Sequence, residues 1–150
     1  MHYFGYGSNL SKRVMDHVCP GHDLVGSACL KDYRLGFTRF SAGWNGGVAD
    51  IIPRSGEHVW GRLYRINQLC IKALDIKESV GVGYDRITVE VTTVEGTTYT
   101  AMSYAVINKD FDEFPAAPAY KATILEGANE AQFPESYMTM LRAIKIYEIS

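Results

Sequence analysis

The sequence predicts an α+β fold in which a small, mostly antiparallel sheet is flanked by helices. Strand signals dominate the first two thirds of the 150 residues, with one helical segment inserted, and two helical segments close the chain. Many strands of modest length in so short a chain favour closure of the sheet into a barrel, because closure removes exposed edges. The length fits one domain over residues 1–150.

Five strands are predicted in the first half of the chain. They cover residues 2–6, 25–30, 33–40, 48–52 and 59–66. A turn-rich segment at 43–47 and a polar segment at 54–57 are expected to separate neighbouring strands. Two later strands, 84–94 and 98–107, alternate apolar and polar residues and are expected to form a hairpin around Glu95-Gly96.

The helical segments carry recognisable start signals. Ser11 can cap a short helix that carries Val14, Met15 and Val18, and Asn67 can cap a helix that runs to about Lys77. The acidic, proline-rich segment 109–118 is predicted to be a loop. Two closing helices are expected over about 118–130 and from about Pro134.

Composition excludes several classes of function. Hydrophobic residues make up 47% and charged residues 21%, which indicates a packed core rather than disorder. The formal net charge of −2 provides no basic stripe for nucleic acid. We see neither an apolar run long enough to span a bilayer nor a basic leader segment, so we expect a soluble, cytoplasmic protein without a membrane partner.

The three cysteines, Cys19, Cys29 and Cys70, show no close pairing and are expected to be free thiols in a reducing compartment. His17 and His22 flank Cys19, but a structural zinc site needs a fourth ligand and usually a second clustered pair. The sequence therefore predicts no metal site and no cofactor.

The first candidate for chemistry is the segment Tyr6-Gly7-Ser8-Asn9-Leu10, which follows a predicted strand and precedes a predicted helix. Glycines at such a turn allow a ligand to approach the backbone closely, and successive N–H groups can bind an anion. The segment lacks the lysine of a P-loop and the last glycine of a dinucleotide fingerprint. An ordinary strand-to-helix turn is the alternative interpretation.

The second candidate is Glu78, at the end of the predicted helix 67–77. A partly buried carboxylate in such a position is suited to shuttle a proton, whereas the alternative is a solvated surface glutamate. Ten tyrosines are many for this length. Four of them lie near loops and could line a small polar pocket, although packing explains most of the ten; the four are Tyr6, Tyr84, Tyr104 and Tyr120.

Several stretches, in order along nearly the whole chain, resemble the γ-glutamylcyclotransferase and AIG2-like family. The N-terminal signature is Tyr3-Phe4-Gly5-Tyr6-Gly7-Ser8-Asn9-Leu10, and Leu74-Asp75-Ile76-Lys77-Glu78 is similar to the segment with the family's catalytic glutamate. Further similar stretches lie at 32–37, 46–51, 59–64, Tyr120, 127–128 and 134–137. One departure is Ser79, where the family often has glycine.

The resemblance implies a closed, mixed β-barrel with flanking helices. It implies an enzyme that releases 5-oxoproline and a free amine from a γ-glutamyl compound by intramolecular attack of the α-amine, with Glu78 as acid and base. Residues 6–10 would cradle the γ-glutamyl group, and Tyr84, Tyr104 and Tyr120 would line the pocket. No metal or redox cofactor is needed for this ring closure.

Two alternatives stay open at this stage. One is a non-catalytic module of the same fold that binds a small acidic ligand. The other is a cyclotransferase specific for γ-glutamyl amines or for glutathione, because the leaving group cannot be derived from loops such as 41–47 and 109–118. A homodimer is also left open.

Overall fold

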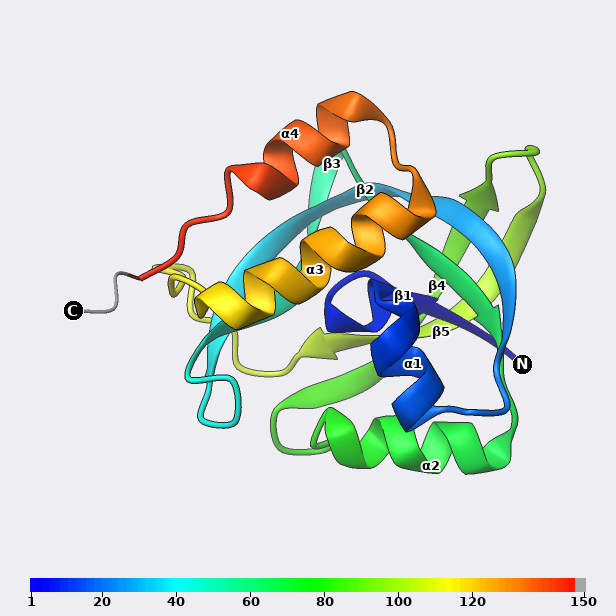
Figure 1. Ribbon diagram of the computed structural model, residues 1–150, viewed down its shortest axis with the longest axis horizontal. Coiled ribbons are helices and arrows are strands. Elements are labelled where there is room, and N and C mark those ends of the chain that lie inside the picture. Colours follow the sequence, from blue (N-terminus) through cyan, green and yellow to red (C-terminus); the bar gives the residue numbers. More distant parts are fainter. Residues whose placement is uncertain (148–150) are drawn as a thin grey trace.

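The computed structural model describes residues 1–147, and within them five strands close into a barrel in the order β1-β3-β2-β4-β5 (Figure 1). The neighbours pair antiparallel except β1 and β5, which run parallel and pair Tyr3 with Met102. This confirms the predicted mixed, mostly antiparallel barrel. The strands are β1 (His2–Gly5), β2 (Asp23–Ser41), β3 (Gly46–Arg65), β4 (Tyr84–Thr93) and β5 (Thr98–Val106).

Two strands are much longer than predicted. The expected strands 25–30 and 33–40 are two parts of β2, and 48–52 and 59–66 belong almost entirely to β3, so the prediction of a separating turn at 54–57 is wrong. Lys31 pairs with His58 and Tyr33 with Pro53, which leaves Asp32 facing four residues in a large bulge. Asp32 accepts a hydrogen bond from the Gly56 N–H at 3.0 Å, and this bond holds the bulge inside the ladder.

Each of the four α-helices begins close to its predicted start. The Ser11 hydroxyl accepts a hydrogen bond from the Val14 N–H, and the Asn67 side chain accepts one from the Cys70 N–H, so both predicted caps are confirmed. No helix in residues 1–147 is long and apolar enough to cross a membrane. The helices are the 3-10 turn η1 (Ser8–Leu10), α1 (Lys12–Val18), α2 (Gln68–Lys77), α3 (Pro118–Ala131) and α4 (Glu135–Arg142).

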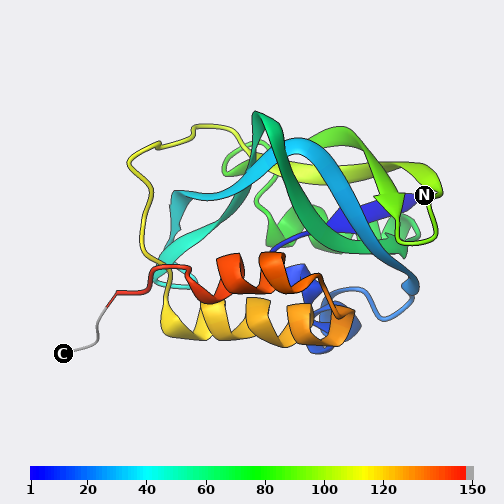
Figure 2. The same ribbon diagram turned by 90° about the horizontal axis from the view of Figure 1, so that it is seen from above.

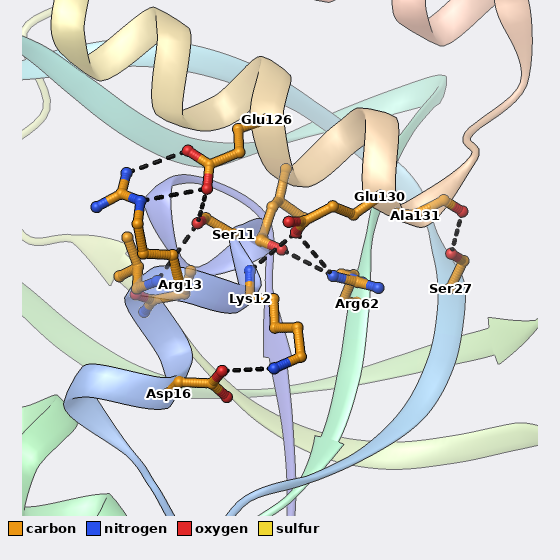
Figure 3. Close-up of polar contacts among 12 residues, drawn as sticks. Ser11, Lys12, Arg13, Asp16, Ser27, Arg62, Glu126, Glu130 and Ala131 are labelled. Carbon is orange, nitrogen blue, oxygen red and sulfur yellow. Dashed lines mark hydrogen bonds and ion pairs between the residues drawn. The ribbon is translucent and has the colours of Figure 1, made fainter.

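Helices α3 and α4 lie together along one side of the barrel (Figure 2). Helix α3 also contacts η1 closely, because Gly127 has no side chain and its helix can press against the Leu10 backbone. Polar contacts surround this approach (Figure 3): Ser11 donates to Glu126 at 3.1 Å and the Lys12 N–H donates to Glu130 at 2.9 Å. The turn after β1 is therefore fixed from the side of α3.

Cys19 and Cys70 form a disulfide, so the prediction of three free thiols is wrong for these two. Their Cα atoms are 5.0 Å apart although 51 positions separate them in the sequence. The bond joins the end of α1 to the first turn of α2, and Cys29 is the free cysteine of the described chain. In residues 1–147, no group of three His, Cys, Asp or Glu side chains has the arrangement of a metal site.

Candidate active site

A pocket opens where the turn after β1, the end of α2 and the start of α3 meet the barrel. The empty space within it is about 550 Å³, part of which is open to solvent. The lining is rich in tyrosine and contains a single carboxylate. The residues that line it are Tyr3, Tyr6, Gly7, Ser8, Asn9, Arg39, Ser41, Trp44, Val48, Ala49, Lys77, Glu78, Tyr84, Tyr104 and Tyr120.

The structure brings together eight of the nine residues that the sequence singled out. Glu78, residues 6–9 and the tyrosines 84, 104 and 120 all line this one pocket. Leu10 does not, because its side chain is fully buried beside Gly127. The Leu10 carbonyl instead accepts a hydrogen bond from Arg62 at 3.1 Å, so this residue anchors the end of the turn.

The turn after β1 is tightly packed against the pocket wall. A Cβ atom on Gly7 would lie 3.0 Å from the Tyr120 hydroxyl oxygen and 3.2 Å from the Ala49 Cβ, so a larger residue has little room. The Leu10 N–H donates to the Gly7 carbonyl at 3.1 Å and closes the turn into η1. This part of the chain is therefore preorganised before any ligand binds.

Glu78 directly follows α2 as its C-terminal cap, and its side chain is 16% exposed, so it is not a solvated surface glutamate. Its Oε1 atom lies 3.4 Å from the Lys77 ammonium and 3.5 Å from the Asn9 side-chain amide nitrogen. Lys77 also donates to the Ser8 hydroxyl at 2.8 Å. The end of α2 is thus connected to the turn after β1 by charge-assisted hydrogen bonds.

Ser79, the departure from the family pattern, adopts a left-handed backbone conformation with a φ of 49°. Glycine adopts this conformation without steric cost, whereas a residue with a Cβ is strained in it. The serine therefore keeps the turn after α2 that a glycine would make, and the Glu78 carboxylate still lines the pocket.

The pocket tyrosines are held by hydrogen bonds to the barrel. The Tyr84 hydroxyl donates to the Ala49 carbonyl at 2.7 Å, and the Tyr120 hydroxyl accepts from the Ala49 N–H at 2.9 Å. Tyr6 donates to the Tyr104 carbonyl at 2.6 Å, and Tyr104 donates to Asp75 at 2.7 Å.

Burial raises the pKa of each of the four tyrosines 6, 84, 104 and 120 far above its ordinary value. They therefore stay neutral near pH 7 and cannot act as bases. Among the lining residues, Glu78 is left as the one carboxylate that can accept and return a proton.

Sequence reasoning missed several lining residues, among them Tyr3, Arg39, Trp44 and Lys77. Tyr3 accepts a hydrogen bond from the Asn9 side chain at 2.7 Å, and the Arg39 guanidinium carbon lies 5.7 Å from the centre of the Tyr84 ring. Tyr3 and Lys77 belong to stretches that carried the resemblance, so they could have been found there. Arg39 lies inside a strand without any local motif.

Comparison with known proteins identifies the family. The model of the AIG2-like family matches residues 58–141. A mouse γ-glutamylcyclotransferase is 37% identical over 148 residues, which cover 95% of this chain and 78% of the mouse protein. The human γ-glutamylcyclotransferase is 36% identical with the same coverage of each chain. This chain belongs to the AIG2-like γ-glutamylcyclotransferase family.

Solved structures of the family agree with the barrel described above. A γ-glutamyl cyclotransferase structure superposes with a TM-score of 0.94 at 33% identity, over 100% of this chain and 90% of the other. The crystal structure of an uncharacterized human protein superposes with a TM-score of 0.92 at 34% identity, over 99% and 90% of the two chains. The predicted family and its fold are therefore confirmed.

Proposed function

We propose that this protein is a γ-glutamylcyclotransferase, which converts a γ-glutamyl compound to 5-oxoproline and a free amine with Glu78 as acid and base. The observation that carries the proposal is the position of Glu78, the one carboxylate among the lining residues, beside the turn after β1. Membership of the family supplies the reaction, and the neutral tyrosines leave the proton transfer to this group.

The reaction needs one proton carrier that works twice. The Glu78 carboxylate removes a proton from the substrate's α-ammonium, and the freed amine attacks the γ-carbonyl carbon, so that a C–N bond forms within the same molecule. The bond from the γ-carbonyl carbon to the leaving nitrogen then breaks, and Glu78 returns its proton to that nitrogen. The ring nitrogen still carries two hydrogens at this point, and it gives up one of them, which the departing amine takes up as it becomes an ammonium. Because both reacting groups belong to one molecule, the entropic cost of bringing them together is small.

Asn9 supports a binding site for the substrate's ammonium. Asn9 as a whole residue is 3% exposed, and its Oδ1 atom has no hydrogen-bond partner within the described residues. A buried acceptor without a partner is costly, and a ligand donor that satisfies it is correspondingly favoured. Since the Asn9 amide also lies 3.5 Å from Glu78, an ammonium bound here would lie close to its base.

The proposal is tested with a panel of substrates. Purified protein is incubated with γ-glutamyl-alanine, a γ-glutamyl amine such as γ-glutamyl-lysine, and glutathione, and 5-oxoproline is measured by mass spectrometry. We expect product with at least one of them. We expect Glu78→Gln to fold normally and to lower kcat by about 10²- to 10⁴-fold, the usual contribution of a positioned acid or base.

Glu95→Gln is the matched control, because Glu95 is exposed in the turn between β4 and β5. This variant should retain full turnover. A near-normal kcat in Glu78→Gln would remove Glu78 from the mechanism. Thermal stabilisation by γ-glutamyl ligands without any product would instead favour the non-catalytic binding module.

A further inference from the structure

The lining of the pocket contains two cations, and their surroundings differ. The Lys77 ammonium is already engaged, by Glu78 and by the Ser8 hydroxyl. Arg39 comes from β2, and among residues 1–147 its side chain forms no ion pair and no hydrogen bond. The pocket therefore contains one guanidinium whose charge the described chain leaves unpaired.

Arg39 is nevertheless held in place. Its guanidinium carbon lies 5.7 Å from the centre of the Tyr84 ring, a distance at which a cation is attracted to the aromatic face. It also lies directly against Gly83, where a Cβ atom would collide with the guanidinium. A positioned but unpaired arginine at a pocket is suited to bind a ligand carboxylate through two parallel hydrogen bonds.

Ring closure places the two carboxylates of a γ-glutamyl amino acid in different parts of the pocket. The α-amine must reach Glu78, and the glutamyl α-carboxylate is attached to the same carbon, so it stays at the end of the pocket near Lys77 and the turn after β1. The leaving group lies beyond the γ-carbonyl, three carbons farther along the chain. If the leaving group is an amino acid, it brings a second carboxylate that none of those groups can pair.

We propose that Arg39 binds the carboxylate of the leaving amino acid and thereby makes the site select γ-glutamyl amino acids over γ-glutamyl amines. This inference rests on the proposed function, because it assumes that a γ-glutamyl compound occupies the pocket. It assigns the leaving-group preference to one strand residue that is not part of the proton transfer.

The test removes the negative charge from the leaving group in one arm and the positive charge from Arg39 in the other. We would measure kcat/KM for γ-glutamyl-alanine and for γ-glutamyl-alaninamide, whose leaving group has no carboxylate, with the wild type, Arg39→Gln and Arg39→Lys. We expect the wild type to prefer the acid over the amide by about 10- to 100-fold, as a charge-assisted pair provides. Arg39→Gln should bring this ratio close to 1, and Arg39→Lys should restore part of it.

Arg54→Gln is the control, because Arg54 has an exposed side chain on β3 and does not line the pocket. Its preference for the acid should equal that of the wild type. An Arg39→Gln variant that keeps the wild-type ratio overturns the proposal, whether or not its overall rate falls. An equal loss on both substrates would place Arg39 at the glutamyl half instead.

Failure of the proposed function gives a different result. If the wild type makes no 5-oxoproline from either compound, the cyclotransferase assignment fails. Binding of the same two ligands, measured by calorimetry in the Glu78→Gln background with and without Arg39→Gln, still decides the role of Arg39. A preference for the acid that disappears with Arg39 supports the contact, and a preference that persists, or none at all, refutes it.

Discussion

Asn9 connects two parts of the pocket that are distant in the sequence, the N-terminal strand with its turn and the end of α2. Its amide nitrogen donates to Tyr3 at 2.7 Å and lies 3.5 Å from Glu78, while its Oδ1 atom has no partner in residues 1–147. The side chain therefore both fixes the pocket wall and leaves an acceptor for the ligand.

We predict that Asn9→Ala raises KM and lowers kcat/KM by about 10-fold or more, because a hydrogen bond to a charged ligand group is lost. Ser8→Ala should have a smaller effect in the same direction, since it removes the acceptor of Lys77. Steady-state kinetics of 5-oxoproline release measure both effects, and Asn129→Ala, at an exposed site on α3, serves as control. Unchanged KM and kcat in both pocket variants would contradict the proposed cradle.

At this scale, the sequence predicted those lining residues of the pocket that lie in contiguous motifs. Residues 6–9 and Glu78 occupy such motifs, and they line the same pocket. Arg39 could not be found, because its strand position shows no pattern, and only the pairing of β2 and the contact with Tyr84 bring it there. Whether each residue has its proposed role stays a prediction.

Among the elements, α1 and α2 depend on each other through a covalent bond. Helix α1 follows the turn of residues 6–10, and α2 ends at Glu78, so the bond between Cys19 and Cys70 joins the two segments that supply this part of the pocket. The sequence did not predict this disulfide, because 51 positions separate the two cysteines and only the packing of α1 on α2 places them together.

We predict that the double variant Cys19→Ala/Cys70→Ala lowers the free energy of unfolding by about 4 kcal/mol, the loop-closure value for this separation. Denaturant unfolding measures the difference. A reducing agent should destabilise the wild type similarly and leave the double variant unaffected, and Cys29→Ala should respond to the reducing agent as the wild type does. Insensitivity of the wild type to reduction would show that the bond does not form in solution.

The disulfide also removes an argument about the cellular compartment. Because Cys19 and Cys70 are paired, the cysteines no longer support a reducing compartment, and the cytoplasmic location stays a prediction.

Local sequence patterns gave a wrong prediction for the long strands β2 and β3, which continue through the expected turn. Pro53 and Gly56 have the composition of a turn, but the register of β2 and β3 continues on both sides of them. A bulge of this size depends on its partner strand, so it cannot be derived from residues 54–57 alone. The hairpin of β4 and β5 was predictable because its turn contains Gly96, whose φ of 93° requires glycine.

Across the whole molecule, buried tyrosines limit stability at high pH. Seven of the ten have a pKa raised mainly by burial, whereas the ordinary value in an unfolded chain is 10.0. A raised pKa in the folded state means that the unfolded chain loses these protons first. The contribution is therefore fully present below about pH 10 and is lost as the pH rises further.

We predict that the melting temperature falls steeply above about pH 10 and that the seven tyrosines ionise together with unfolding. Thermal denaturation between pH 8 and pH 11, followed by both circular dichroism and tyrosinate absorbance, measures this coupling. Tyr6→Phe should make the fall less steep, because one buried phenol is removed. Complete tyrosine ionisation in a protein that is still folded would contradict the prediction.

The overall architecture was the most predictable level. Strand and helix order follows from alternation, capping residues and turn signals, and the family resemblance supplied the closed, mixed barrel. The single-domain boundary and the homodimer stay predictions, because neither follows from the contacts within residues 1–147.

The parallel pairing of β1 with β5 determines how late the barrel can close while the chain is being synthesised. Tyr3 can pair with Met102 only after 99 further residues have been made, which takes about 5 to 20 s at ordinary rates of translation. During this interval β3 can cover one edge of β1, but the other edge stays open next to aromatic residues that end up buried. Tyr120 follows later still, so the ribosome has added 120 residues before all the residues that line the pocket exist.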